Sequence, residues 1–130
     1  MKRILVIDDE SQIRSMLRLM LERAGYEVLE ASDGAEGIRL YRENSADLVI
    51  TDLIMPNKDG IGMIIALKKE FPEVKIIAMS GGGLNRPEGY LIGAQKLGAT
   101  RTLTKPINRE QMLRAVKDTL KAPSASAEEE

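Results

Sequence analysis

The sequence predicts an α/β fold in which helices cover both faces of a parallel sheet. Five short apolar runs alternate with five stretches of helical periodicity along the 130 residues. The first, third and fourth runs are almost continuous in Ile, Leu, Val and Met, which is typical of strands buried on both faces. Strict alternation of strand and helix favours right-handed crossovers, so five strands joined in this way form a doubly wound, three-layer sandwich.

The expected strands are short, and the first expected helix follows directly on the first strand. We expect the strands at residues 3–7, 27–31, 48–51, 75–79 and 101–104. Gly25 can adopt the positive φ that often ends a helix, so the first helix stops near it. The apolar stripe of this helix, spaced for one face, comprises Ile13, Met16, Leu17, Met20 and Leu21.

The last expected helix begins after Asn108, a favourable N-cap residue, with Gln111 three positions later as in a capping box. Three weaker helices are expected over residues 35–44, 61–71 and 88–97, the second ending before Pro72 and the third at Gly98. The apolar stripe of the last helix comprises Met112, Leu113, Val116 and Leu120.

A single domain over residues 1–121 accounts for this pattern, because 130 residues fit one domain of common size. Residues 122–130 are small, polar and acidic, so we expect a disordered tail or the stub of a linker there. The apolar run after the first basic residues is too short for a signal peptide, and no run approaches the ~18 residues of a membrane span. We therefore expect a soluble cytoplasmic protein.

Composition excludes several kinds of chemistry. The chain has neither Cys nor His, which removes disulfides, thiolate chemistry, the usual zinc ligands and the commonest general base. Its 19 basic and 20 acidic residues are nearly balanced, so we expect no contact of this domain with nucleic acid or an anionic membrane. Catalysis, if any, must use carboxylates, Lys, hydroxyl groups or backbone amides.

Polar residues stand where four of the expected strands end. Asp8 and Asp9 follow the first strand, Asp52 the third, Ser80 the fourth and Lys105 the fifth. In a parallel sheet these ends lie on one edge, where doubly wound proteins bind their ligands. Each residue alone has an ordinary explanation as a cap, a turn or a solvated side chain, so the prediction depends on all of them together.

Three carboxylates brought together repel one another unless a cation lies among them. Oxygen ligands without His or Cys indicate a hard ion, and Mg²⁺ (or Mn²⁺) fits better than Ca²⁺, for which the chain has no twelve-residue loop. Lys105 and Ser80 suit the oxygens of a phosphoryl group rather than a metal alone. Asp52, on the central strand, is then the best candidate for a nucleophile that forms an aspartyl-phosphate.

The segments LVIDDE, DLVITDLIMPNKDG, IIAMSG and LTKPI, in this order, resemble the receiver domain of bacterial two-component response regulators. The resemblance covers about residues 1–121. It implies a flavodoxin-like sandwich with five helices and strand order 2-1-3-4-5. It also implies phosphorylation by a sensor histidine kinase or a histidine phosphotransfer protein, since a phosphohistidine donor must lie on another chain.

The resemblance also implies a role for each site residue. Asp52 would be the phosphoacceptor and a metal ligand, Asp9 a direct Mg²⁺ ligand, and Asp8 a ligand acting mainly through water. The backbone carbonyl of Ile54 would complete the metal site, and Lys105 would bind the phosphoryl oxygens across a cis bond to Pro106. Ser80 would be the hydroxyl that moves on phosphorylation, with the change read at the face formed by helix four, strand five and helix five.

Two positions depart from the family pattern. Thr102 stands three residues before Lys105, where receiver domains often have an aromatic residue whose rotamer follows the switch hydroxyl. The segment after Ser80 is longer than usual and has glycines at residues 81–83, which raise the entropy of the free loop. We expect switching to order this loop and the helix after it, with Tyr90 in place of the missing ring.

Other functions remain open from the sequence. A small phosphohydrolase with an aspartyl nucleophile would use similar residues, but it would need a second acid two positions after Asp52, where Ile54 stands. A flavin binder would need a hydroxyl-rich phosphate loop after the first strand and aromatic residues around the ring, whereas the chain has acids at that loop and few aromatic residues. A degenerate receiver acting only as a docking module, a stand-alone receiver and a fragment without its effector domain are further alternatives. Ile54 and Gly82 cannot activate water, so we expect slow self-dephosphorylation.

Overall fold

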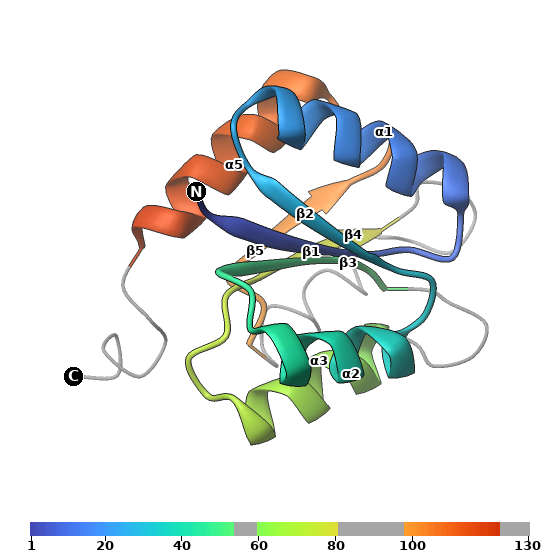
Figure 1. The fold of residues 1–130 in the computed structure, drawn as a ribbon, viewed down its shortest axis with the longest axis vertical. Helices are drawn as coiled ribbons and strands as arrows, with labels where there is room; N and C mark the ends of the chain where they lie inside the picture. Colours follow the sequence, from blue (N-terminus) through green and yellow to red (C-terminus); the bar gives the residue numbers. More distant parts are fainter. Residues whose placement is uncertain (54–59, 81–97, 123–130) are drawn as a thin grey trace.

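The computed structural model describes residues 1–53, 60–80 and 98–122. Its sheet has five parallel strands in the order β2-β1-β3-β4-β5 (Figure 1). The strands are β1 (Arg3–Ile7), β2 (Glu27–Ala31), β3 (Leu48–Asp52), β4 (Ile76–Ser80) and β5 (Arg101–Thr104). The described helices are α1 (Ser11–Arg23), α2 (Gly34–Asn44), α3 (Gly60–Glu70) and α5 (Arg109–Lys121). The predicted fold class and strand order are confirmed.

Helices cover both faces of the sheet. The helices α1 and α5 lie on one face and α2 and α3 on the other (Figure 1). Side chains of a strand point alternately to its two faces, so Ile4 and Val6 of β1 pack beneath α1 and α5, while Leu5 and Ile7 pack against α2 and α3. This double burial is the physical reason for the continuous apolar runs in the sequence.

Several boundaries differ by one residue from those expected. β3 includes Asp52, and β4 runs from Ile76 to Ser80. The strands extend this far because the ladder continues to pair Asp52 with Met79 and Ser80 with Thr104. The helix α2 begins at Gly34 because the carboxylate of Asp33 accepts a hydrogen bond from the backbone N–H of Glu36 at 2.9 Å.

The caps of the first and last helices agree with the sequence. Gly25 has a φ of 97°, just beyond the end of α1. Asn108 caps α5 by accepting a hydrogen bond from the N–H of Gln111 at 3.0 Å.

The stripe predicted for α1 was wrong at Met16, which is 38% exposed, because it lies at the border of the buried face. In α5, Ala115 and Thr119 are buried although they were not part of the predicted stripe, whereas Leu113 and Leu120 of that stripe are only partly buried.

Some expectations fall outside the described residues. The expected helix at 88–97 is one of them, so four of the five expected helices are described. The tail is the other, since only its first residue, Ala122, is described. The single domain over 1–121 stays a prediction.

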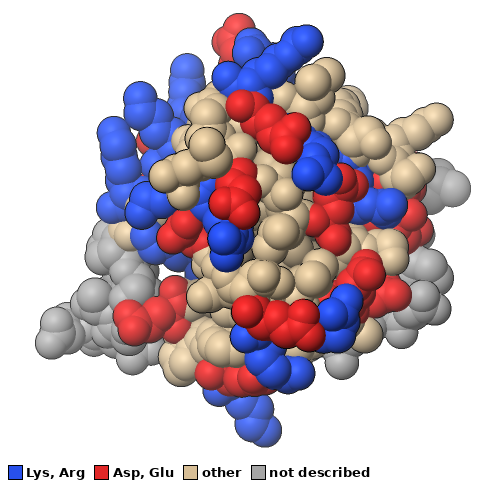
Figure 2. All heavy atoms as spheres, viewed as in Figure 1, with Lys and Arg blue, Asp and Glu red and all other residues tan. Residues whose placement is uncertain are grey.

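Acidic and basic side chains are interspersed over the face shown in Figure 2. Within the described ranges, no helix has both the length and the apolar character that a membrane crossing requires.

Candidate functional site

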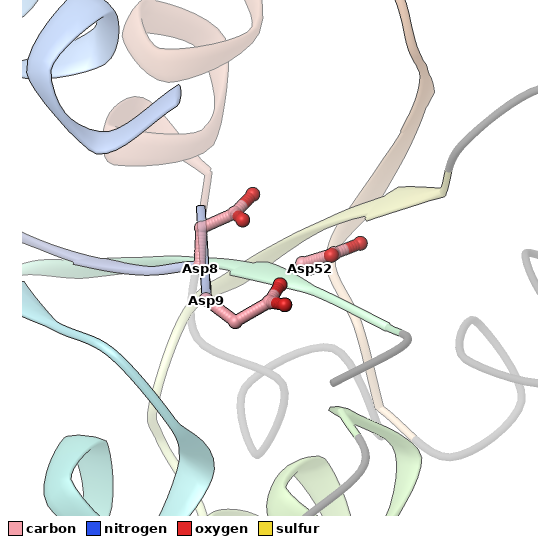
Figure 3. Close-up of side chains that lie close together, drawn as sticks. All are labelled: Asp8, Asp9 and Asp52. Carbon is pink, nitrogen blue, oxygen red and sulfur yellow. The ribbon is translucent and has the colours of Figure 1, made fainter. Parts of the chain in front are cut away.

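The expected polar residues meet at the carboxyl-terminal edge of the sheet. Asp8 and Asp9 follow β1, Asp52 ends β3, Ser80 ends β4 and Lys105 follows β5. One carboxylate oxygen from each of the three aspartates lies within 4.8 Å of the others. Figure 3 shows these carboxylates extending beyond the sheet in the same general direction. The structure therefore brings together the acidic cluster that the sequence predicted.

The aspartates differ in burial and in the partners of their oxygens. Asp8 is fully buried, and both of its carboxylate oxygens accept hydrogen bonds, one from the N–H of Glu10 at 2.9 Å and one from Lys105 Nζ at 3.0 Å. Asp9 is exposed, and among the described residues its carboxylate has no hydrogen-bond or ion-pair partner. The geometry thus leaves the oxygens of Asp9 available to a ligand, while those of Asp8 are engaged.

Asp52 lies deeper than Asp9, with 5% of its surface exposed. Its backbone belongs to the central strand β3, which pairs with β1 and β4. The ammonium of Lys105 lies 3.5 Å from one of its carboxylate oxygens. A buried carboxylate beside a cation, at the carboxyl-terminal edge of the sheet, is a chemically competent oxygen nucleophile.

Lys105 holds the positive charge of the site. Burial lowers the pKa of its ammonium, but the charges of Asp52 and Asp8 and the hydrogen bonds to them outweigh burial, so the pKa is raised overall. Glu10 also approaches it, at 3.9 Å, although its side chain is largely exposed. The Lys105–Pro106 bond is cis, as the resemblance implied. Lys105 is therefore a fixed cation at neutral pH, able to bind an anionic oxygen.

Ser80 is fully buried, and its hydroxyl has no hydrogen-bond partner within the described part of the chain. Its backbone carbonyl accepts a hydrogen bond from the N–H of Lys105 at 2.8 Å, which ties the ends of β4 and β5 together. An unsatisfied buried hydroxyl costs free energy, so its retention needs an explanation such as a bound group.

The residues fit a hard divalent cation. The nearby ligands are carboxylate oxygens of Asp8, Asp9 and Asp52, and the chain has no His or Cys that would favour zinc. The Lys105 ammonium contacts this cluster, and the unsatisfied Ser80 hydroxyl lies at the end of β4 on the same edge of the sheet, so both are candidate donors for an anion. A cation bound with a small tetrahedral anion matches this division into acceptors and donors.

Some predicted positions lie outside the described residues: Ile54, Gly82, Tyr90 and the glycines at 81–83. Thr102 is described, and it lies half-buried in β5, where it lines a shallow cleft between β5 and α5 together with Leu103, Arg114 and Ala115.

Two contacts that support the site were not predicted from the sequence, although Gly60 itself marks a turn there. Gly60 begins α3, and a side chain there would collide with backbone, since an added Cβ would lie 2.6 Å from Leu53 Cα and would also meet the carbonyl of Asp52. Its N–H donates to the carbonyl of Leu53 at 2.8 Å. Arg14 donates a hydrogen bond to the carbonyl of Asp8 at 2.7 Å. The turn signal of Gly60 was visible in the sequence, whereas Arg14 looked like any solvated helix residue.

Comparison with known proteins agrees with this geometry. The family described as the response regulator receiver domain matches residues 4–117. The chain is 35% identical over 119 residues to the chemotaxis protein CheY of Bacillus subtilis, covering 91% of this chain and 97% of that protein. It is 31% identical over 126 residues to the transcriptional regulatory protein GlrR of Escherichia coli, covering 97% of this chain but 28% of that protein.

Solved structures give the same result. A response regulator receiver domain protein from Clostridium thermocellum is 37% identical, with a TM-score of 0.85 and coverage of 92% of this chain and 94% of that chain. The response regulator TrrA from Thermotoga maritima, solved in complex with Mg²⁺-BeF, is 31% identical, with a TM-score of 0.79 and coverage of 92% and 99%. This chain therefore belongs to the response regulator receiver domain family, the phosphorylation-controlled receivers of two-component signalling.

Proposed function

We propose that Asp52 is the phosphoacceptor of this receiver. The observation that carries this proposal is the convergence of three aspartates within 4.8 Å of one another, with Lys105 3.5 Å from Asp52 and 3.0 Å from Asp8. Asp52 is chosen over Asp8 because both oxygens of Asp8 already accept hydrogen bonds. It is chosen over Asp9 because it lies on the central strand and in contact with Lys105.

In the proposed transfer a new P–O bond forms to a carboxylate oxygen of Asp52 while the P–N bond to the donor imidazole breaks. The leaving imidazole nitrogen takes up a proton. Lys105 binds a phosphoryl oxygen and offsets the negative charge that gathers on it. The hydroxyl of Ser80, which has no partner within the described residues, donates to a second phosphoryl oxygen.

The same edge would hold Mg²⁺ (or Mn²⁺). We assign Asp9, Asp52 and the backbone carbonyl of Ile54 as direct ligands and Asp8 as a ligand through water. Asp9 suits direct binding because its carboxylate is exposed and, among the described residues, unpaired. When bound, the cation would act as a Lewis acid that offsets the negative charge of the phosphoryl oxygens. The complex of TrrA with Mg²⁺-BeF supports the pairing of this cation with a small anionic group at such a site.

The donor we propose is a phosphohistidine on a sensor histidine kinase or a histidine phosphotransfer protein, since this chain contains no His. The domain, residues 1–121, then acts as a signalling switch in the cytoplasm and catalyses only its own phosphorylation and dephosphorylation. It binds neither nucleic acid nor membrane by itself. The output passes through the face of helix four, strand five and helix five to an unidentified partner or effector domain.

The test is intact-mass spectrometry after incubation with a small phosphodonor and Mg²⁺. The wild type is expected to gain one phosphate, and Asp52→Asn none. Asp118→Asn is the matched control, because Asp118 is an exposed residue whose carboxylate lies 3.7 Å from Arg101, away from the acidic cluster. An adduct on the Asp52 variant would refute the assignment. Steady turnover of a phosphate ester by the wild type would favour the phosphohydrolase alternative instead.

A further inference from the structure

Arg14 connects the helix α1 to the backbone of the acidic cluster. It lies one turn into the helix, and its side chain is only 18% exposed. Its Nη1 donates a hydrogen bond to the backbone carbonyl of Asp8 at 2.7 Å. Its Nε donates to Glu30 of the neighbouring strand β2 at 3.2 Å. One guanidinium therefore joins helix, strand and acidic cluster, a geometry that its planar fork of donors makes possible.

Glu30 holds this guanidinium in place. Its two carboxylate oxygens are shared between Arg14 and Arg18, one helical turn apart, with Arg18 Nη1 at 2.5 Å. Arg18 also pairs with Glu22 at 3.2 Å. Arg18 thus carries the same charge on the same helix and contacts the same carboxylate, but within the described part of the chain it forms no hydrogen bond with Asp8. This difference separates the effect of the hydrogen bond from that of charge.

The backbone and side chain of Asp8 are held from four directions. Its N–H donates to the carbonyl of Ala31 at 3.1 Å. Its carboxylate accepts from Glu10 and Lys105, and its carbonyl accepts from Arg14. By contrast, Asp9 has an exposed carboxylate with no partner among the described residues. The direction of the Asp9 side chain thus depends on the Asp8–Asp9 peptide, which Arg14 fixes at its oxygen.

We propose that Arg14 is a positioning residue for the divalent cation: by fixing the Asp8 carbonyl it orients the Asp8–Asp9 peptide and so presents the Asp9 carboxylate towards Asp52. This inference rests on the proposed function, since it takes Asp9 and Asp52 as cation ligands. Residues that orient metal ligands without touching the metal commonly change its affinity ~10–100-fold when mutated.

Charge and position predict opposite effects, which makes the inference testable. Arg14 is itself a cation near the acidic cluster, so its removal should strengthen Mg²⁺ binding if charge alone matters. If Arg14 acts by position, its removal weakens binding. Arg14→Lys retains the charge but cannot donate simultaneously to Asp8 and Glu30 in the same plane. The lysine variant should then bind Mg²⁺ about ten-fold more weakly, as should Arg14→Gln.

The experiment titrates Mg²⁺ alone into each protein and follows backbone amide shifts by NMR at moderate salt. The variants are Arg14→Lys, Arg14→Gln and the matched control Arg18→Gln, with thermal unfolding measured without Mg²⁺. Phosphorylation by a small phosphodonor provides a second readout. The Arg14→Lys and Arg14→Gln variants should need about ten-fold more Mg²⁺ to reach the half-maximal rate of phosphorylation. Their rate at saturating Mg²⁺ should change little, whereas general damage to the fold would lower that plateau.

Two results would overturn the inference: wild-type affinity in Arg14→Lys, or an equal loss in Arg18→Gln. Failure of the proposed function looks different. If Asp9→Asn and Asp52→Asn bind Mg²⁺ as tightly as the wild type, the cation is not held by these residues at all. If those two variants lose Mg²⁺ while Arg14→Lys keeps it, the site stands and only the positioning role falls.

Discussion

The ammonium of Lys105 donates a hydrogen bond at 3.0 Å to the carboxylate of Asp8, a residue 97 positions earlier in the chain. The contact joins the ends of β1 and β5, which lie on either side of β3 and β4 in the sheet. It also compensates one of the three clustered carboxylates with a charge that remains in place at neutral pH. Lys105 also lies 3.5 Å from Asp52, so the excess negative charge falls mainly on Asp9, whose carboxylate has no partner among the described residues.

This excess charge should make the protein more stable when Asp9 is neutralised. Asp9→Asn removes repulsion between carboxylates within 4.8 Å of each other. Its free energy of unfolding without Mg²⁺ should rise by about 1 kcal/mol, the scale for exposed charges at this separation. Urea unfolding measures this, and a loss of stability would contradict the repulsion.

With Mg²⁺ present, the wild type should become more stable than Asp9→Asn. A ligand present at about ten times its Kd stabilises the native state by about 1.4 kcal/mol. We expect this increase in the wild type, and much less in Asp9→Asn, when unfolding is repeated with Mg²⁺. Asp118→Asn, which changes a carboxylate on α5, should respond like the wild type. Equal stabilisation of the Asp9 variant would mean that the cation binds elsewhere.

Ser80 should show opposite effects on stability and activity. Its buried hydroxyl has no partner among the described residues, so Ser80→Ala should leave the free energy of unfolding unchanged or raise it by up to about 1 kcal/mol. The same variant should slow phosphorylation by a small phosphodonor, because a donor to the phosphoryl oxygens is lost.

Thr119 provides the control for this prediction. Thr119 is also fully buried, and within the described chain its hydroxyl has no hydrogen-bond partner. However, it lies near the carboxyl-terminal end of α5 rather than at a strand end of the site. Thr119→Val should stabilise the fold comparably and leave the rate of phosphorylation unaltered. If Ser80→Ala is phosphorylated at the wild-type rate, the hydroxyl has no part in transfer.

Gly60 should be intolerant of a side chain for a reason that involves the site. In Gly60→Ala the new Cβ would meet backbone atoms of Leu53 and Asp52, which cannot move without displacing the end of β3. We expect a loss of about 1–3 kcal/mol in the free energy of unfolding, typical of overpacking, together with slower phosphorylation.

Gly37→Ala is the comparison for this prediction. The three atoms nearest to the new Cβ all belong to the side chain of Ile7, with Cδ1 the closest and Cγ1 2.9 Å away, and a side chain can shift. The gain of about 1 kcal/mol in helix propensity offsets part of that strain. A Gly37 variant less stable than the Gly60 variant would show that backbone contact is not the deciding factor.

Stability at high pH should depend on Tyr41. Burial, and secondly the charge of Asp47, raise the pKa of its phenol above the ordinary value of 10.0. The unfolded chain therefore loses this proton first, so the contribution of the phenol to stability is complete below pH 10 and declines as pH rises towards the folded-state pKa. Tyr41→Phe should keep the edge contact with Phe71, whose ring centroid lies 4.8 Å away, and should show a smaller decline above pH 10. Denaturant unfolding at pH 9 and above measures this, and identical slopes would contradict it.

The sequence predicted most of the frame that positions the site. The boundaries of β1, β2 and β5 were correct because both ends of each run are marked by charged or turn residues. Asp52 and Ser80 were placed just after their strands, whereas the ladder includes them. A parallel ladder continues through a polar residue when its neighbour can still pair, and the sequence carries no signal for this.

The supporting contacts of the site were less predictable. Asp8, Asp9, Asp52 and Lys105 could be grouped because topology alone brings strand ends together. The contact of Arg14 with the Asp8 carbonyl depends on the exact position of α1 over β2, which only packing determines. The same applies to the close approach of Gly60 to the backbone of β3.

The most direct test of the central claim is to locate the phosphoryl group chemically. Borohydride reduces an acyl phosphate, but not a free carboxylate, to an alcohol, so a phosphorylated aspartate becomes homoserine. The wild type, phosphorylated by a small phosphodonor with Mg²⁺, is reduced, digested and sequenced by tandem mass spectrometry. Homoserine at position 52 alone is the expected result. Homoserine at position 8 or 9, or its absence from a protein that carries phosphate, would contradict the assignment of Asp52 as the phosphoacceptor.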